Sequence, residues 1–287
     1  MDMKKRYSFR ICGLNLALQL EQPIQIQGDM LPFCGDEAAL DLLVDGRTTA
    51  DLSEGEGKLL LRESERLVFR RGGHICRCRA TRLNEPLYAK MDYDLAAPNR
   101  VQLTVREADW GWSTDHLRLW STLSLPQLLL HFQTLIFHAS YIVSNGRAIL
   151  FTAPSRTGKS TQAELWRKFR NAHVVNGDKA GVTLRERPMA HGVPFSGTSG
   201  ICENVSAPLA AVVSLSQAPE NTVRRLGPSQ AVAALCPNVF VDQAIAEEWA
   251  LALQLLLDVA ASVSVYALAC TPDVRAVETL EQALFET

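Results

Sequence analysis

Residues 150–162 read Leu-Phe-Thr-Ala-Pro-Ser-Arg-Thr-Gly-Lys-Ser-Thr-Gln, an apolar strand followed directly by a Gly-Lys-Ser-Thr helix start. A helix N-terminus offers unpaired main-chain N–H donors and the positive end of the helix dipole, and both attract anions. In such a loop the lysine, here Lys159, reaches the β and γ phosphates, and the hydroxyl of Ser160 can bind Mg²⁺. The stretch therefore predicts a nucleotide-binding site.

The predicted phosphate-binding residues are consecutive: Ser155, Arg156, Thr157, Gly158, Lys159, Ser160 and Thr161. The match is incomplete, because Ala153 stands where the full pattern has glycine, at a point where the chain turns tightly. The alternative is an ordinary helix capped by Ser155 or Thr157. The apolar strand before the loop and the helical pattern after it (Ala163, Leu165, Trp166 and Phe169) favour the phosphate site.

Composition narrows the range of partners. The 287 residues could form one large domain or two modest ones. With 29 basic and 31 acidic residues, the chain has no electrostatic footprint for nucleic acid or an anionic membrane, so we expect small molecules or proteins as partners. Seven cysteines without a regular framework indicate a reducing compartment. The N-terminus lacks the apolar core of a signal peptide, and we expect a cytoplasmic protein with no membrane segment.

The sequence pattern changes near residue 122, from β-forming runs to a mixture of helices and strands. Residues 6–108 favour strands, with β-forming runs separated by glycine-rich breaks at residues 7–12, 59–62, 67–69 and 101–105. An apolar stripe predicts a helix over 125–137, with Pro126 in its first turn. We therefore expect a β-rich N-terminal domain (1–122) and a nucleotide-binding domain (123–287).

A hairpin sets the topology of the second domain. Residues 139–144 and 147–152 read as strands joined by Asn145-Gly146, the strongest signal for a two-residue hairpin turn. The strand that leads into the phosphate loop is then antiparallel to its predecessor, which argues against a doubly wound fold and for an α/β domain on a mixed sheet. A strand at Val174 should run parallel to the loop strand and bring Asp178 to the same edge as Lys159.

Downstream, residues 210–215, 223–226 and 263–268 read as strands, and residues 229–261 as mainly helical with a break at Pro237. A last helix is predicted to start at Thr271-Pro272, with Thr271 as its N-cap and Pro272 at its first position.

Asp178 is the best candidate acid. It follows the first strand after the loop, so it could bind Mg²⁺ through a water molecule or take the proton from an attacking hydroxyl. Two other interpretations exist: a turn residue in Asn-Gly-Asp-Lys, or the Asp-x-x-Gly element of GTPases in Asp178–Gly181. Only 19 positions separate Asp178 from Lys159, and no Asn-Lys-x-Asp is present, so a GTPase is disfavoured.

Other residues have weaker signals. His138, expected at the junction of the 125–137 helix and the hairpin, is either a packed core histidine or part of the site. Residues 195–200 form a small-residue loop that could bind an anion through its N–H groups or simply connect two elements. Arg224 and Arg225 point opposite ways on a strand, so at most one can face the site. His74, Cys76 and Cys78 share one strand face without a fourth ligand, and we expect no zinc there.

Together, these motifs resemble the HPr kinase/phosphorylase family, whose catalytic domain is related to phosphoenolpyruvate carboxykinase. The likeness covers about residues 130–215. In that family the segment reads His-Gly, a hairpin, Gly-x-Ser-Gly-x-Gly-Lys-Ser, a helix and Asp-Asp, which is matched here by His138, Ser155, Gly158, Lys159, Ser160 and Asp178. The resemblance implies a mixed-sheet, PEP-carboxykinase-like P-loop kinase domain after a small β-rich domain. It also implies ATP and Mg²⁺ as cofactors, His138 and Asp178 in proton transfer, and Ser160 and Asp178 at the metal.

Several departures from the family pattern bear on which class of substrate the chain would act on. Ala153 and Arg156 replace two loop glycines, and Gly177 replaces the first aspartate. The Glu-x-Arg-Gly-rich stretch with which HPr kinases engage HPr is absent. The chain is more similar to the divergent HPr-kinase-like proteins of bacterial peptide-modification systems, some of which phosphorylate a serine on a small peptide. The resemblance thus implies a peptide or small-protein substrate, and the resembled family forms homo-oligomers. Two alternatives stay open: an ATP-binding protein without catalysis, and a kinase acting on a small metabolite.

Overall fold

The structure is a computed structural model that describes residues 4–36, 39–82, 85–197 and 199–285. Two compact units divide the chain: Met1–Leu128 together with Asp242–Ala246, and Leu129–Val241 together with Glu247–Thr287. The chain therefore passes between the units three times. The first passage comes shortly after the boundary expected near residue 122.

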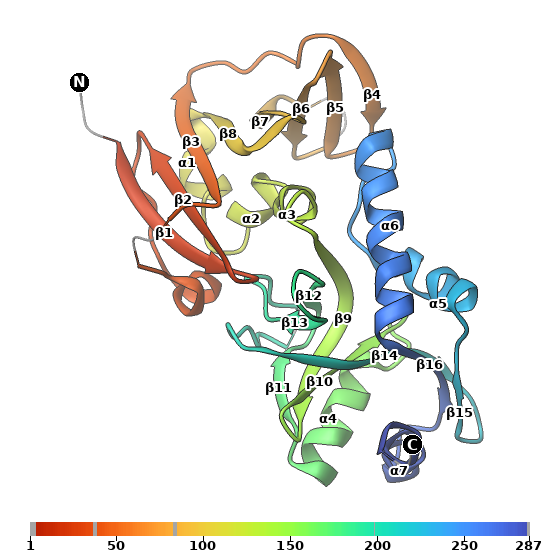
Figure 1. The fold of residues 1–287 in the computed structure, drawn as a ribbon. Coiled ribbons are helices and arrows are strands. Elements are labelled where there is room, and N and C mark those ends of the chain that lie inside the picture. The colour runs from red at the N-terminus through yellow and green to blue at the C-terminus, as the bar shows by residue number, and fades with distance from the viewer. Residues whose placement is uncertain (1–3, 37–38, 83–84, 198, 286–287) are drawn as a thin grey trace. The chain divides into compact units, whose positions relative to one another are not determined.

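The first unit contains an eight-stranded mixed sheet of order β1-β2-β3-β8-β7-β6-β5-β4 (Figure 1). Its middle strands β2, β3 and β8 run parallel to one another, and all other pairs are antiparallel. Each of the four β-forming runs predicted from sequence lies in a strand, apart from Cys12, which belongs to the turn after β1. The bounds are β1 Lys5–Ile11, β2 Leu14–Leu20, β3 Leu42–Thr49, β4 Lys58–Arg62, β5 Arg66–Arg71, β6 His74–Ala80, β7 Leu87–Asp94 and β8 Ala97–Arg106.

Short helices complete this unit: η1 Gly28–Phe33, η2 Glu107–Asp109, α1 Trp110–Ser113 and α2 Leu119–Thr122. The segment 242–246 adds a buried acid to it. Asp242 forms an ion pair with the guanidinium of Arg77, and both side chains are almost fully buried. Arg77 Nε also donates to the hydroxyl of Tyr93 at 3.1 Å, and Arg66 lies 3.3 Å from the other oxygen of Asp242.

The helix predicted over 125–137 is wrong in its second half. Helix α3 spans only Leu125–Leu130, and strand β9 begins at Thr134 and runs to Ser144. Gln133, with φ 55°, turns the chain between them. Residues 134–137 are buried without a gap, and such a short apolar run has the same appearance in a buried strand and in a helix. As a result, His138 lies within β9 and not at a helix-to-strand junction.

The second unit contains a mixed sheet of order β10-β9-β12-β13-β14-β16-β15, in which β11 also pairs with β9 and β10 also pairs with β14. The unit is thus α/β with mixed strand directions, as expected. The bounds are β10 Arg147–Thr152, β11 His173–Asn176, β12 Lys179–Thr183, β13 Met189–His191, β14 Ser206–Gln217, β15 Thr222–Arg225 and β16 Ser264–Cys270.

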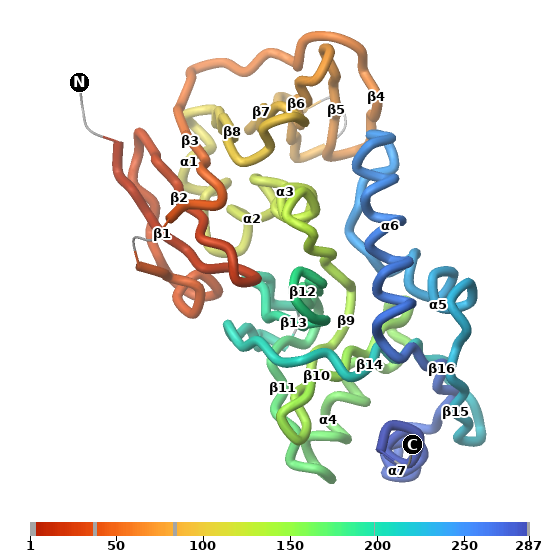
Figure 2. Tube along the Cα trace, viewed as in Figure 1, coloured from red at the N-terminus to blue at the C-terminus, as the bar shows by residue number. Residues whose placement is uncertain are grey.

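The predicted hairpin is confirmed. Strands β9 and β10 pair antiparallel, with Ser144 opposite Arg147. Asn145 and Gly146 have φ values of 50° and 71°, which a two-residue type I′ turn requires. The trace then continues from β10 into helix α4, Lys159–Arg170 (Figure 2). β11 is also antiparallel to β9, so it runs in the direction of β10, as predicted for the strand after the helix.

Helices cover both faces of this sheet (Figure 1). Helix α4 and α7 (Val274–Phe285) pack on one face, where Trp166 and Leu280 meet Phe151. α5 (Pro228–Leu235) and α6 (Ala246–Ser262) pack on the other, where Leu235 and Leu256 belong to the same core as Tyr141. A short η3 turn, Cys236–Asn238, follows α5. None of the helices in the described residues is both long enough and apolar enough to cross a membrane.

The start predicted for the last helix is wrong. Helix α7 begins at Val274, and Asp273 Oδ1 accepts the N–H of Arg275 at 2.9 Å in its first turn. Thr271 is engaged elsewhere, because its N–H donates to Asn221 Oδ1 and its hydroxyl accepts from Asn221 Nδ2. Thr271 therefore does not cap α7. Its two hydrogen bonds to Asn221 hold the end of β16 against the turn before β15.

Candidate functional site

The loop between β10 and α4 has the backbone shape of an anion cradle. Arg156 and Gly158 adopt positive φ values of 65° and 115°, and Gly158 is the N-cap of α4. No side chain caps this helix, so the alternative of an ordinary start capped by Ser155 or Thr157 does not apply. A Cβ placed on Gly158 would have open space around it. The first-turn N–H groups of α4 are thus left for a ligand.

Ala153 fits its place without strain. In the loop, positive φ occurs at Arg156 and Gly158 but not at Ala153. Its methyl group is fully buried in the core formed with Phe151 and Trp166. The alanine therefore replaces a glycine at a position where this backbone does not need one, whereas Arg156 occupies a conformation that favours glycine.

Lys159 is the buried cation of the loop. Its Nζ donates to the carbonyl oxygens of Ala153 at 2.9 Å and Pro154 at 3.3 Å. Burial lowers the pKa of Lys159, and the nearby carboxylate of Asp178 opposes that shift. The hydrogen bonds of the ammonium group thus go to main-chain oxygens of the loop, which are weaker partners than a phosphate.

The hydroxyls of the loop region face outward. Ser155, Ser160 and Thr161 are exposed and Thr157 is half-buried. Ser160, in the first turn of α4, makes no hydrogen bond to Asp178 within the described chain. Across the residues that the structure describes, no cluster of three or more His, Cys, Asp or Glu side chains could by itself hold a metal. In proteins Mg²⁺ is usually bound by one or two side chains together with phosphate oxygens and water.

Asp178 is held by a rigid turn after β11. The side chain of Asn176 accepts the N–H groups of Asp178 at 2.9 Å and Lys179 at 3.0 Å. Its amide nitrogen donates to the carbonyl oxygens of Phe195 and Val193, so the turn is tied to the next loop as well. This buried asparagine fixes where the carboxylate stands.

The carboxylate of Asp178 has two partners. Oδ1 lies 3.3 Å from His138 Nε2, and Oδ2 lies 2.5 Å from Lys179 Nζ. Burial lowers the pKa of His138, and the positive charges of Lys159 and Lys179 add to this effect. Near neutral pH the imidazole is therefore uncharged. The structure brings Lys159, His138 and Asp178 close enough for their charges to influence one another.

The loop 195–200 packs directly against this acid. A Cβ on Gly197 would stand 2.5 Å from Asp178 Cβ, and one on Gly177 would stand 2.4 Å from the hydroxyl of Ser199. Thr198 lies outside the described residues. Both glycines are therefore required by close packing. A second acid at position 177 could not be accommodated without movement of Ser199.

Sequence reasoning missed two neighbours of the acid. Lys179 Nζ lies 5.3 Å from the ring centres of both Phe195 and Phe240, and the rings of His138 and Phe240 are 6.1 Å apart. Phe240 is brought there because its N–H donates to Ile136 O on β9. Lys179 could have been noticed as the residue next to Asp178, but nothing in the local sequence marks Phe240.

The remaining sequence candidates lie elsewhere. Arg224 and Arg225 are on β15 at the end of the sheet, where Arg224 donates to Gln230 Oε1. His74, Cys76 and Cys78 share a face of β6 in the first unit, with the two sulfurs 3.6 Å apart.

Three comparisons with known proteins bear on this site. A family model described as "SynChlorMet cassette protein ScmC" matches residues 112–286, which include the loop, His138 and Asp178. No curated protein matches the chain. Among solved structures, the HPr(Ser) kinase/phosphatase from Coxiella burnetii is 12% identical over 53% of this chain and 93% of that chain, with a TM-score of 0.29. That score is too low to establish a common fold.

Proposed function

Since the chain belongs to the ScmC family of SynChlorMet cassette proteins, we propose that its second unit is a Mg²⁺- and ATP-dependent phosphotransferase that phosphorylates a serine hydroxyl of a peptide or small protein. The observation that carries the proposal is the convergence of three side chains from separate elements. Lys159 is the first residue of α4, His138 comes from β9, and Asp178 comes from the turn between β11 and β12.

The residues present fit a nucleotide polyphosphate. The loop presents the uncapped N-terminus of α4. Lys159 supplies a buried positive charge, and phosphate oxygens can replace the carbonyl groups of Ala153 and Pro154 as its hydrogen-bond acceptors. Ser160 and Asp178 are the residues that would hold Mg²⁺. When bound, the ion neutralises charge on the phosphate oxygens as the phosphoryl group leaves.

Asp178 is the proposed base. Its carboxylate takes the proton of the serine hydroxyl while the oxygen of that hydroxyl attacks the γ-phosphorus. The bond from this phosphorus to the bridging β–γ oxygen breaks, and ADP leaves with the electron pair. A carboxylate can accept about four hydrogen bonds, so it can receive the proton while its contacts with His138 and Lys179 persist.

His138 is a positioning residue in this proposal. Its uncharged imidazole can donate Nε2–H to Asp178 Oδ1, which orients the carboxylate without adding a positive charge. Lys159 and the helix N-terminus then remain the main positive groups at the phosphate position.

The proposed acceptor is a hydroxyl group outside this chain. A serine of a peptide or small protein is supported by the motif resemblance to serine kinases. The exposed ring of Phe240 beside Lys179 adds an apolar surface on which a substrate chain could rest. A metabolite hydroxyl is the alternative acceptor.

Two variants test the mechanism. Lys159→Ala should weaken ATP binding, measured by calorimetry, and abolish transfer of labelled γ-phosphate to protein or peptide in cell extract. Asp178→Asn should keep ATP affinity within a few fold and reduce transfer by about 10²–10⁴. Mass spectrometry of species labelled only by the wild type identifies the acceptor. Full transfer activity in Asp178→Asn would show that the proposed base is wrong.

A second candidate function is nucleotide binding without transfer. It is favoured by Gly177, where a second acid would require Ser199 to move, and by the close ion pair of Asp178 with Lys179. In that case ATP would raise the melting temperature of the wild type but not of Lys159→Ala, and no acceptor would gain label.

A further inference from the structure

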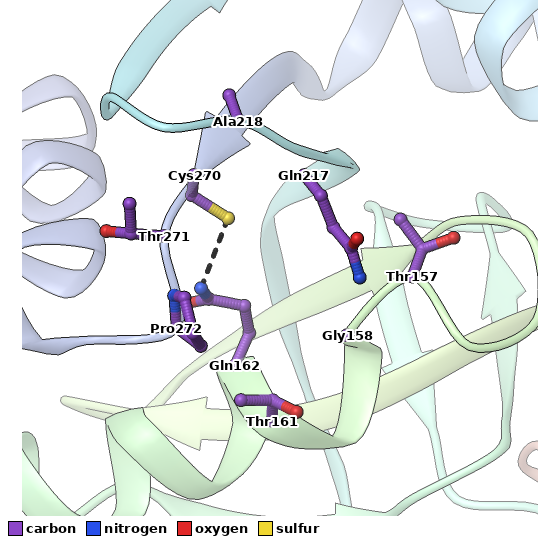
Figure 3. A pocket seen from close by; sticks show the side chains of 9 residues that line it. All are labelled: Thr157, Gly158, Thr161, Gln162, Gln217, Ala218, Cys270, Thr271 and Pro272. Atoms are coloured by element: carbon purple, nitrogen blue, oxygen red, sulfur yellow. Dashed lines mark hydrogen bonds between the residues drawn. The ribbon is translucent and has the colours of Figure 1, made fainter.

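A cavity of about 480 Å³ opens on the side of the phosphate loop next to β14 and β16. Gly158 and Thr161 form its loop end, Gln217 closes it at the end of β14, and Cys270 and Pro272 line it after β16 (Figure 3). It therefore starts at residues of the candidate phosphate site. A ligand with its phosphates on the α4 N-terminus would have its remaining part directed at this cavity.

The cavity wall contains a polar side chain that lacks part of its hydrogen bonding. Gln162, on the first turns of α4, is only 2% exposed. Its Nε2 donates to Cys270 Sγ at 3.3 Å, as Figure 3 shows, but its Oε1 has no hydrogen-bond partner among the described residues. Buried amide oxygens are rarely left unpaired, and this one, which is itself covered, can pair with a ligand once its surroundings shift to expose it.

We infer that the cavity binds the base of the nucleotide, and that Gln162 recognises an exocyclic amino group of an adenine. This inference rests on the proposed function, because the phosphates must occupy the loop. The side chains of Cys270, Pro272 and Ala218 offer an apolar surface to the faces of a ring. The amide of Gln162 offers its carbonyl oxygen as an acceptor to the 6-amino group of adenine while its Nε2 keeps the bond to Cys270.

The same geometry disfavours hypoxanthine. An oxygen replaces the 6-amino group in this base, so the carbonyl of Gln162 faces another acceptor and stays unpaired as long as the bond from Nε2 to Cys270 keeps the amide in its orientation. Discrimination by one such hydrogen bond is about tenfold or more in affinity. ATP should thus bind at least about tenfold more tightly than ITP, and inorganic tripolyphosphate should bind through the loop alone.

The test compares Mg²⁺ complexes of ATP, ITP and tripolyphosphate by calorimetry on the full chain. Gln162→Leu should bring the affinity ratio of ATP to ITP close to one and leave tripolyphosphate binding unchanged. Gln254→Leu, on the exposed side of α6, is the matched control and should keep the wild-type ratio. An unchanged ratio in Gln162→Leu would overturn the base site while the phosphate site stands. If tripolyphosphate and ATP both fail to bind the wild type, the proposed function itself is wrong.

A second measurement does not depend on a variant. Cys270 should react with N-ethylmaleimide, slowly because burial raises the pKa of its thiol. ATP at saturation should protect Cys270 at least about tenfold, whereas tripolyphosphate should not, because it leaves the cavity open. Exposed Cys34 of the first unit is the internal control and should react equally in all samples. Peptide mapping by mass spectrometry separates the two sites. Equal labelling of Cys270 with and without saturating ATP would overturn the inference.

Discussion

The imidazole of His138 and the carboxylate of Asp178 face each other at 3.3 Å because the main chain places them there. β9 and β12 pair with Lys179 opposite His138, and the N–H of Ala139 donates to the carbonyl oxygen of Asp178 at 2.9 Å. The pair is thus fixed by strand register and by the turn that Asn176 holds. Burial lowers the pKa of His138, the charges of Lys159 and Lys179 lower it further, and the carboxylate of Asp178 opposes both effects.

The pKa of His138 should respond to Lys159. Burial and both lysines hold the pKa of His138 below its ordinary value of 6.5, so the imidazole is uncharged at neutral pH and gains a proton only in more acidic solution. Lys159→Ala removes one positive charge and should raise this pKa towards the ordinary value. An NMR titration of the ring, assigned with His138→Gln, measures it. A titration that Lys159→Ala does not alter would contradict the electrostatic coupling.

Positions 156 and 158 of the phosphate loop both have positive φ, and substitutions there should change stability in opposite directions. Gly158→Ala should reduce the free energy of unfolding by about 1–3 kcal/mol, because φ 115° is a strained region for any residue with a Cβ. Arg156→Gly should increase stability by at most about 1 kcal/mol, because relief of left-handed strain exceeds the added flexibility of the unfolded chain. Urea unfolding measures both. Gly111→Ala, in α1 with open space and no positive φ, is the control and should not destabilise.

His191 should make the protein less stable in acid. It is buried, with Nε2 2.9 Å from the hydroxyl of Thr183 and Nδ1 2.7 Å from that of Ser206, and burial lowers its pKa to about 4. In the unfolded chain His191 gains a proton near pH 6.5, whereas in the folded chain it gains one only near pH 4. The stability contribution is therefore complete above pH 6.5 and falls by about 3 kcal/mol as the pH drops to 4.

The measurement is the slope of unfolding free energy against pH between 6.5 and 4. His191→Asn should flatten this slope whatever its effect on stability at neutral pH, because asparagine has no charge to gain. If the variant keeps the wild-type slope, other groups cause the acid sensitivity.

Asp242→Ala should be among the most damaging single changes in the first unit. It leaves the buried guanidinium of Arg77 with the Tyr93 hydroxyl but without its carboxylate, and breaking such a pair costs about 3–5 kcal/mol. Asp45→Ala removes a more exposed partner of Lys4 and should cost less than about 1 kcal/mol. Chemical denaturation of both variants gives the comparison. Equal losses would mean that burial does not set the difference.

The parts of the site that depend on neighbours in sequence could be predicted. The loop from Ser155 to Thr161 and the Asn145-Gly146 turn follow from local backbone chemistry, and the hairpin then gave the mixed sheet. The direction of the strand before Asp178 places this residue at the same edge of the sheet as Lys159. In each case one short motif determines the geometry.

The parts that depend on packing could not be predicted. The helix expected over 125–137 became a strand after residue 133, because a buried run of apolar residues has no period that separates the two. Phe240 reaches His138 only through a main-chain bond to β9, and Gln162 meets Cys270 only because α4 and β16 lie close together. No local sequence pattern predicts such contacts between segments that are far apart in the sequence.

The return of residues 242–246 to the first unit means that the two units cannot be exchanged independently. A recombination at position 128 that joined this second unit to an unrelated first half would carry along Asp242 without its arginine. The first half left behind would retain a buried arginine without its acid. Residues 1–128 thus depend on a five-residue segment from the later half of the chain for one of their buried ion pairs.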